Sequence, residues 1–333
     1  MITTGKYPNL RLRRNRKNDW IRRLTKENTL SVDDLVQPIF IIEGKNKKIP
    51  IKSMPGVFRY SLDKVNHLVK DLIKIGIPMI AIFPYVEKKY KNIHGSEALN
   101  ENNLVCRATR TIKKKFKDKI GIMCDVALDP YTSHGHDGII KSDQIDNDLT
   151  LKILSKQAVI QARAGCDVIA PSDMMDGRIA IIRKALDENN FNSVRILSYA
   201  VKYASSYYGP FRDAVGSKKL LKGDKKTYQM DYSNSDEALR EVSMDIKEGA
   251  DIILIKPGMP YLDILSLVKK TFNFPTFSYQ VSGEYLMINK SIESGFMKKE
   301  EIIIETLSCF KRAGADAILT YFAMDAAKIL SKS

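Results

Sequence analysis

The sequence predicts a (β/α)8 TIM barrel, in the α/β class, preceded by an extended N-terminal arm, and two observations lead to this prediction. Eight short apolar runs rich in β-branched residues alternate with longer segments of helical periodicity. The chain has 333 residues, which suits one barrel of this kind, for which about 250 residues are typical. Strands that alternate with helices pair in parallel, and eight repeats favour closure into a barrel. The predicted strands are residues 36–42, 78–84, 120–128, 167–171, 195–201, 251–257, 276–281 and 316–322.

Helical periodicity is clearest between these runs, and the joints from helix to strand repeat one form. A glycine is followed within two residues by an aspartate at Gly165, Gly249 and Gly314. Glycine suits a left-handed helix terminus from which the chain re-enters a strand. An open doubly wound sheet is the alternative, and the absence of a GxGxxG turn after the first predicted strand disfavours it. The clearest helical segments are residues 62–75, 149–164, 236–248 and 300–313.

The N-terminal segment is strongly basic. Residues 1–24 carry eight lysines and arginines but a single acidic residue, Asp19. A transit peptide is one interpretation, but Pro8, Trp20 and the lack of an apolar region argue against a secretion signal. We expect residues 1–35 to form an arm that contacts a neighbouring subunit and residues 36–333 to form the catalytic barrel.

The overall charge and composition point away from two classes of partner. The formal net charge is +15, which fits either a polyanion partner or lysines spread over solvated faces. The lysines are scattered and accompany no nucleic-acid motif, so we expect no nucleic-acid partner. No apolar stretch approaches the roughly 18–20 residues of a membrane span, so we expect no membrane partner. The four cysteines form no CxxC pair and are expected to be buried free thiols in a reducing, cytoplasmic compartment.

One connection is unusually long. Residues 209–234 are polar, contain glycine and follow the fifth predicted strand. Long stretches without regular structure in a compact domain are usually lids or disordered segments. We expect an irregular lid over the active end of the barrel, made cationic by Arg212, Lys218, Lys219, Lys222, Lys225 and Lys226.

Two lysines stand where an α/β barrel places its chemistry, at the C-terminal ends of strands. Lys202 follows the fifth predicted strand and Lys256 lies at the end of the sixth. Burial and a neighbouring ammonium both lower a lysine pKa, which leaves free amine to form a Schiff base with a ketone. Each lysine alone could instead reach solvent or pair with a carboxylate. The other polar residues at predicted strand ends are Asp125, Asp129, Ser172, Asp173, Ser282 and Tyr321.

The segment after the third predicted strand has two interpretations. Asp129, His134, His136 and Asp137 could form an oxygen and nitrogen metal site, for which Mg²⁺ would suit the aspartates better than Zn²⁺. Equally, the segment could be a polar loop with local hydrogen bonds. Asp173 of the next segment could be a plain helix N-cap.

Eight segments in order give the chain a resemblance to the porphobilinogen synthases, or 5-aminolevulinate dehydratases, over nearly its whole length. The most distinctive are DVALDPYTSHGHDG (125–138), APSDMMDGR (170–178), SYAVKYASSYYGPFRDAVGS (198–217), IKPGMPYLD (255–263) and YQVSGEY (279–285). The others are RLRRNRKNDWIRRL (11–24), MPGVFRYS (54–61) and YQMDYSNSDEALREV (228–242).

The resemblance implies a hydro-lyase that condenses two 5-aminolevulinate molecules to porphobilinogen, in tetrapyrrole (heme) biosynthesis. It also implies a homo-octamer assembled through the arm. Lys202 and Lys256 match the Schiff-base lysines of the A side and the P side. Ser282 and Tyr321 match the binders of the P-side carboxylate. Arg212 matches a lid residue that binds the A-side carboxylate, and Lys225 and Gln229 match further such residues less securely. Further polar and aromatic residues expected at the substrate site are Asp125, Ser172, Tyr208, Phe211 and Tyr279.

One departure concerns metal. Zinc-dependent members carry three cysteines at the positions of Ala127, Asp129 and Asp137, so a three-thiolate zinc site cannot form here. The chain resembles the aspartate-rich, magnesium-responsive branch, which implies an allosteric Mg²⁺ held mainly through water by Glu241. Asp129 and Asp137 are open to a role in proton transfer or as active-site metal ligands.

Two rival functions differ in a testable way. A class I aldolase on the same fold would normally use one imine lysine and a phosphate site, but no glycine-rich loop follows the seventh predicted strand. A basic nucleic-acid-binding protein would show affinity that falls steeply with salt and no imine chemistry.

Overall fold

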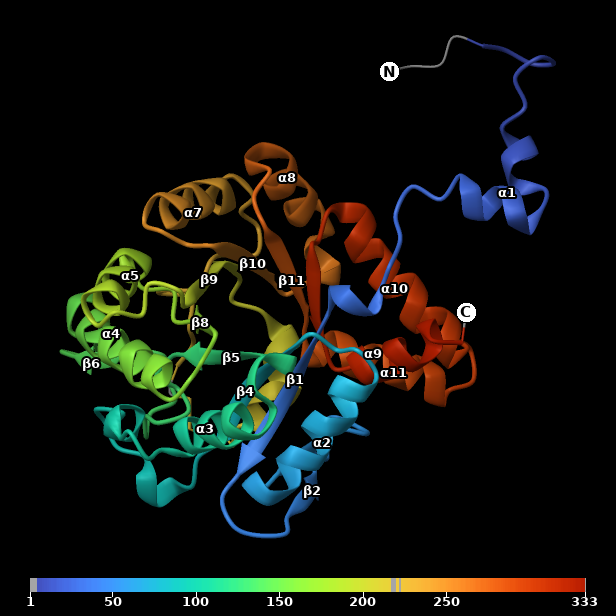
Figure 1. Ribbon diagram of the computed structural model, residues 1–333. Coiled ribbons are helices and arrows are strands. Elements are labelled where there is room, and N and C mark those ends of the chain that lie inside the picture. The colour runs from blue at the N-terminus through green and yellow to red at the C-terminus, as the bar shows by residue number, and fades with distance from the viewer. Residues whose placement is uncertain (1–4, 217–219, 222, 333) are drawn as a thin grey trace.

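Eight parallel strands close into a barrel in the computed structural model, which describes residues 5–216, 220–221 and 223–332 (Figure 1). Neighbouring strands pair in chain order, and the barrel closes where Leu35 of the first strand pairs with Ile318 of the last. The predicted fold class is therefore confirmed. The barrel strands are β1 (Leu35–Ile42), β4 (Met79–Tyr85), β5 (Gly121–Val126), β8 (Val168–Pro171), β9 (Arg195–Lys202), β10 (Ile252–Lys256), β11 (Thr276–Gln280) and β12 (Ala317–Thr320).

Helices surround the barrel, and their apolar faces cover the outside of the strands (Figure 1). The helices are α2 (Leu62–Lys74), α3 (Leu104–Phe116), α4 (Asn147–Arg163), α5 (Arg178–Glu188), α6 (Gly209–Ala214), α7 (Asp236–Lys247), α8 (Leu262–Phe272), α9 (Ser282–Glu293), α10 (Lys299–Ala313) and α11 (Ala323–Leu330). Short 3-10 helices include η3 (Lys88–Tyr90), η4 (Ser96–Leu99), η6 (Ser206–Tyr208) and η7 (Met259–Tyr261). Among the described residues, no helix is long and apolar enough to cross a membrane.

The glycine–aspartate joints have a structural explanation at the N-terminal end of the barrel. Gly249 has a φ of +104°, a conformation that other residues rarely adopt. The aspartate that follows reaches the preceding strand: Asp251 Oδ2 accepts from the Ile196 backbone N–H at 2.7 Å. Asp316 does the same for Thr276, also at 2.7 Å. The joints therefore pin adjacent strands together at the end opposite the active site.

Three elements were absent from the predicted pattern, two hairpins and one short helix. A hairpin of β2 (Lys48–Pro50) and β3 (Phe58–Tyr60) follows β1 and extends the sheet beside it. A second hairpin, β6 (Ile139–Lys141) with β7 (Gln144–Asp146), follows the segment after β5. The expectation that residues 209–234 have no regular structure is wrong at their start, where Pro210 near the first turn suits the helix α6. Lid residues Lys218, Lys219 and Lys222 lie outside the described residues.

The N-terminal arm stands apart from the barrel. It contains the 3-10 helix η1 (Leu12–Arg16) and the short helix α1 (Asp19–Leu24), neither of which buries a residue. Figure 1 shows both projecting away from the barrel. Large apolar side chains are exposed there, including Trp20 and Leu24, which are 57% and 76% exposed.

Candidate functional site

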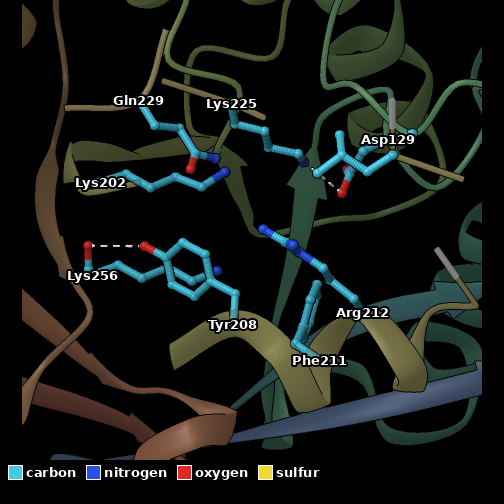
Figure 2. A pocket seen from close by; sticks show the side chains of 10 residues that line it. Asp129, Lys202, Tyr208, Phe211, Arg212, Lys225, Gln229 and Lys256 are labelled. Carbon is cyan, nitrogen blue, oxygen red and sulfur yellow. Dashed lines mark hydrogen bonds and ion pairs between the residues drawn. The ribbon is translucent and has the colours of Figure 1, made fainter. Parts of the chain in front are cut away.

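The two lysines lie side by side at the C-terminal end of the barrel. Lys202 is the last residue of β9 and Lys256 the last of β10, and the two residues are direct partners in the parallel pairing. They are only 5% and 7% exposed. Figure 2 shows both side chains entering the same pocket, which Lys225, Arg212 and Gln229 also line. The predicted placement of two amines on adjacent strands is thus what the structure has.

Lys256 is surrounded by aromatic rings. Its Nζ lies 4.8 Å from the ring centre of Tyr279 and 5.2 Å from those of Tyr199, Tyr208 and Phe211. Burial, reinforced by the charge of Lys202, lowers the pKa of Lys256 from 10.5 to about 7. The ring faces attract an ammonium but do not replace water as hydrogen-bond acceptors. Much of this lysine is therefore a free amine near neutral pH.

Lys202 has polar partners instead. Its Nζ donates to the backbone carbonyl of Ser172 and lies 3.6 Å from Asp137 Oδ1. Ser172 follows β8, so the carbonyl comes from the neighbouring strand end. The two lysines thus differ in surroundings, one polar and one aromatic, which suits different roles.

Asp137 is fully buried between two lysines. Its Oδ2 lies 2.6 Å from Lys225 Nζ, and Tyr228 donates to the same oxygen at 2.9 Å. Burial alone would raise the pKa of Asp137, but Lys202 and Lys225 outweigh it and hold the pKa at about 2. Burial would lower the pKa of Lys225, but the negative charges of Asp129 and Asp137 outweigh burial and raise that pKa. Lys225 is also 3.4 Å from Asp129, so it bridges both aspartates.

Asp125, near the C-terminal end of β5, differs from Asp137 in its acidity. Burial, together with the charge of Asp129, raises its pKa to about 6. Its Oδ1 has no hydrogen-bond partner among the described residues. Asp125 and Asp137 therefore differ widely in acidity within one site, an arrangement typical of sites that move protons.

The lid enters the pocket through α6. Tyr208 precedes this helix and donates to the Lys256 carbonyl at 3.2 Å, while Phe211 and Arg212 lie within it (Figure 2). Ser282, at the start of α9, accepts from the Phe211 backbone N–H at 2.9 Å. Its neighbour Gly283 packs so closely that a Cβ would lie 2.5 Å from the Tyr207 carbonyl oxygen. The VSG sequence therefore permits the lid helix to dock on α9.

Tyr279 and Tyr321 form a pair beneath Lys256. Their hydroxyls are hydrogen-bonded at 2.8 Å across β11 and the end of β12. Tyr321 also stacks on Phe40 of β1, with ring centres 6.0 Å apart. Burial raises the pKa of both hydroxyls, so both are neutral donors at physiological pH.

The space around the lysines is small. The cavity that Lys202, Lys256, Arg212 and Lys225 line has a volume of about 40 Å³. That is room for about three water molecules. The lysines are therefore closely enclosed by the side chains around them.

Two interpretations were open for the segment after β5, a metal site and a polar loop. Among the described residues, no group of three or more His, Cys, Asp or Glu side chains is placed to hold a metal ion. His134 Nε2 lies 3.3 Å from the Ile93 carbonyl oxygen, and His136 Nδ1 lies 3.1 Å from the Tyr228 hydroxyl. These contacts fit the polar-loop interpretation, and both aspartates face Lys225.

One further expectation is wrong, and one residue was missed. Asp173 is not a helix N-cap, since α5 begins only at Arg178; its Oδ1 accepts from the Met175 backbone N–H at 2.8 Å. Sequence reasoning also missed Lys91, whose buried Nζ has no hydrogen-bond partner among the described residues and feels the charge of Asp129. Only a prediction of loop pairing between residues 92 and 132 would have found it.

Comparison with known proteins decides the family. The delta-aminolevulinic acid dehydratase family matches residues 9–329. The chain belongs to the delta-aminolevulinic acid dehydratase family. The expected activity of that family, a hydro-lyase that makes porphobilinogen from 5-aminolevulinate in heme biosynthesis, is thereby confirmed.

Individual relatives agree. The delta-aminolevulinic acid dehydratase of Bradyrhizobium diazoefficiens is 56% identical, over 96% of this chain and 91% of its own. That of Rhodobacter capsulatus is 45% identical, over 99% of each chain. A crystal structure of the Toxoplasma gondii enzyme in complex with the reaction product porphobilinogen superimposes with a TM-score of 0.94 at 45% identity, covering 96% of this chain and 91% of that one.

In this dehydratase chain, Glu241 lies apart from the lysine pair. It belongs to α7 and lines a separate depression with Glu237 and Asp176. Burial raises the pKa of Glu241 to about 7; Arg178 opposes the shift, while the carboxylates Asp245, Asp176 and Glu237 add to it. These carboxylates share one depression, but among the described residues no three such side chains converge closely enough to hold a metal ion. Gln229 lines this depression and the lysine pocket, so the lid connects the two.

Proposed function

We propose that Lys202 and Lys256 each form an imine with one 5-aminolevulinate molecule, Lys202 on the A side and Lys256 on the P side. The observation that carries this proposal is their direct pairing on β9 and β10, both buried in one pocket. In each imine, the amine nitrogen bonds to the ketone carbon and a water molecule leaves. Two substrates held on adjacent strands react as if in a single molecule, which removes most of the entropic cost of their encounter.

The difference between the lysines suits this division. Lys256 is largely a free amine near neutral pH, because burial and Lys202 lower its pKa to about 7. At that pKa about half of it is nucleophilic at pH 7, against well under 0.1% for an ordinary lysine. Lys202, beside Asp137, has a carboxylate that stabilises the positive charge of a protonated imine.

Carboxylate recognition is assigned to neutral and cationic donors on opposite sides of the pocket. We assign the P-side carboxylate to Ser282, which follows the neighbouring strand β11, and to Tyr321, which follows β12 and is hydrogen-bonded to Tyr279 beside Lys256. We assign the A-side carboxylate to Arg212, Lys225 and Gln229, which line the pocket from the lid (Figure 2).

The remaining pocket residues shape the site and move protons. Tyr208, Phe211 and Tyr279 surround Lys256 and contribute to its burial, which lowers its pKa. Asp129 and Asp137 are close enough to the lid lysine to exchange protons near the A-side substrate. Asp125 and Ser172 complete the polar wall.

Mg²⁺ is assigned to Glu241 as an allosteric ion. The depression around Glu241 supplies carboxylates from α7 and from the loop before α5, and Gln229 joins it to the pocket. A divalent cation there would offset the mutual repulsion of these carboxylates and stabilise the adjacent lid segment. The ion supplies charge rather than catalysis.

The arm is assigned to assembly in a cytoplasmic homo-octamer. Residues 1–35 form the assembly segment and residues 36–333 the catalytic barrel. The arm exposes four large apolar side chains, those of Tyr7, Leu12, Trp20 and Leu24. Contact with a second copy of the chain would remove this apolar surface from water.

The test is formation of the pyrrole product from 5-aminolevulinate by purified protein. Lys202→Met and Lys256→Met should each abolish it, because each removes one imine. Lys70→Met, which removes an exposed lysine of α2, serves as the matched control and should retain full activity. Full activity in either of the first two variants would overturn the assignment.

A further inference from the structure

Lys91 is held beside the Asp129 loop by backbone pairing. It follows η3 in the connection between β4 and α3. The next residue, Asn92, forms a parallel bridge with Thr132, and its N–H donates to the Tyr131 carbonyl at 3.2 Å. The Ser133 N–H donates back to the Asn92 carbonyl at 3.0 Å. These contacts fix the position of Lys91 next to the loop that begins at Asp129.

The ammonium of Lys91 is buried without a hydrogen-bond partner among the described residues. Burial lowers the pKa of Lys91, and the charge of Asp129 opposes that shift. An ammonium that is buried without hydrogen bonds costs folding free energy. We therefore expect the cation at this position to have a functional role. Within the described part of the chain, Asp129 is the carboxylate whose charge acts on Lys91 and raises its pKa.

Substrate binding creates that role. In the closed pocket Lys225 holds both Asp129, at 3.4 Å, and Asp137, at 2.6 Å. The cavity of about 40 Å³ leaves no room for a substrate molecule beside Lys225 in this arrangement of side chains. When Lys225 turns to the substrate carboxylate, it must weaken these ion pairs. Asp137 keeps Lys202 at 3.6 Å, but no second salt bridge to Asp129 exists among the described residues.

We propose that Lys91 is a positioning residue that takes over the charge of Asp129 when Lys225 engages the A-side substrate carboxylate. This inference rests on the A-side role proposed for Lys225. Lys91 touches neither substrate; it acts through Asp129. Lys91 then stabilises the charge of Asp129 in place of Lys225. The free-energy cost of moving Lys225 away from Asp129 is therefore smaller.

Loss of the Lys91 charge should affect the A-side substrate more than the P-side substrate. Lys91→Met keeps the length of the side chain but removes its charge, so Lys225 should stay on Asp129 and A-side binding should weaken. We expect the 5-aminolevulinate concentration for half-maximal borohydride trapping at Lys202 to rise about tenfold, or about 1.4 kcal/mol. Trapping at Lys256 should shift less than about twofold, a difference that general loosening of the site would not produce.

Peptide mapping after reduction reads both lysines in one sample. Lys91→Arg should restore trapping at Lys202, because it keeps the charge. Lys89→Met is the matched control, since Lys89 lies in the same loop but is exposed and paired with Glu87, and it should change nothing. In an Asp129→Asn background, Lys91→Met should have no further effect, because the charge through which it acts is gone.

Several outcomes would overturn the proposal. Equal shifts at both lysines, no shift at Lys202, or an undiminished effect of Lys91→Met in the Asp129→Asn background would each do so. If neither lysine is trapped in the unmodified protein, the imine assignment fails and this proposal fails with it. If both are trapped but Lys91→Met has no effect, the imine assignment stands and only the role of Lys91 is lost.

Discussion

Replacing Lys256 with methionine should stabilise the protein while abolishing its activity. Lys256 is 7% exposed, and its Nζ faces four aromatic rings. A pKa held at about 7 instead of 10.5 corresponds to a cost of folding on the order of 5 kcal/mol when both states are protonated. Methionine has a similar length and no charge, so Lys256→Met should recover a substantial part of that cost at pH 6.

The gain should depend on pH in a fixed direction. Between pH 7 and 10.5 the unfolded chain holds a proton on Lys256 that the folded chain has lost, so stability of the unmodified protein rises with pH. The advantage of Lys256→Met should therefore be largest at or below pH 7 and shrink as pH rises. Urea-unfolding midpoints at pH 6, 7, 8 and 9 measure it.

The control is Lys70→Met, which removes an exposed lysine from α2 and should shift the midpoint little at any pH. If Lys256→Met destabilises the fold by the same amount at every pH, then Lys256 is not an ammonium held at a cost, and its described environment does not lower its pKa.

Three further predictions follow from the same contacts. Lys202→Met removes a like charge, so the pH midpoint for imine trapping at Lys256 should move upward; a downward shift in a pH series of borohydride reductions would contradict the charge coupling. Glu284→Ala removes the carboxylate that accepts three backbone N–H groups near Lys256, and should lower stability by about 2–4 kcal/mol in urea unfolding; a loss below about 0.5 kcal/mol would disagree with its burial. Glu241→Gln should abolish stimulation by Mg²⁺ in EDTA-treated enzyme while leaving basal porphobilinogen formation; retained stimulation would place the ion elsewhere.

Sequence reasoning found the barrel because apolar strand-like runs recur eight times and the glycine–aspartate joint recurs at three of the connections. It located both lysines for the same reason, since strand ends follow directly from strand positions. It missed the β2–β3 hairpin, whose strands are only three residues long and carry no periodicity. It also missed α6, because a helix of six residues within a polar segment leaves little signal.

Contacts between distant loops were beyond the sequence. Asp129 and Asp137 were expected as proton carriers or metal ligands, but their pairing with Lys225 joins residues about ninety apart in the chain. The buried position of Lys91 depends on the bridge between Asn92 and Thr132, which no local pattern predicts. Such pairings follow from loop conformations, and loops obey no period that a sequence could reveal.

The central claim is that two lysines hold two substrate molecules on adjacent strands. Borohydride reduction of the protein with isotopically labelled 5-aminolevulinate, followed by mass spectrometry of the peptides, tests it most directly. The claim predicts one reduced substrate on the peptide that contains Lys202 and one on the peptide that contains Lys256. Label on neither peptide, with porphobilinogen still formed, would contradict it.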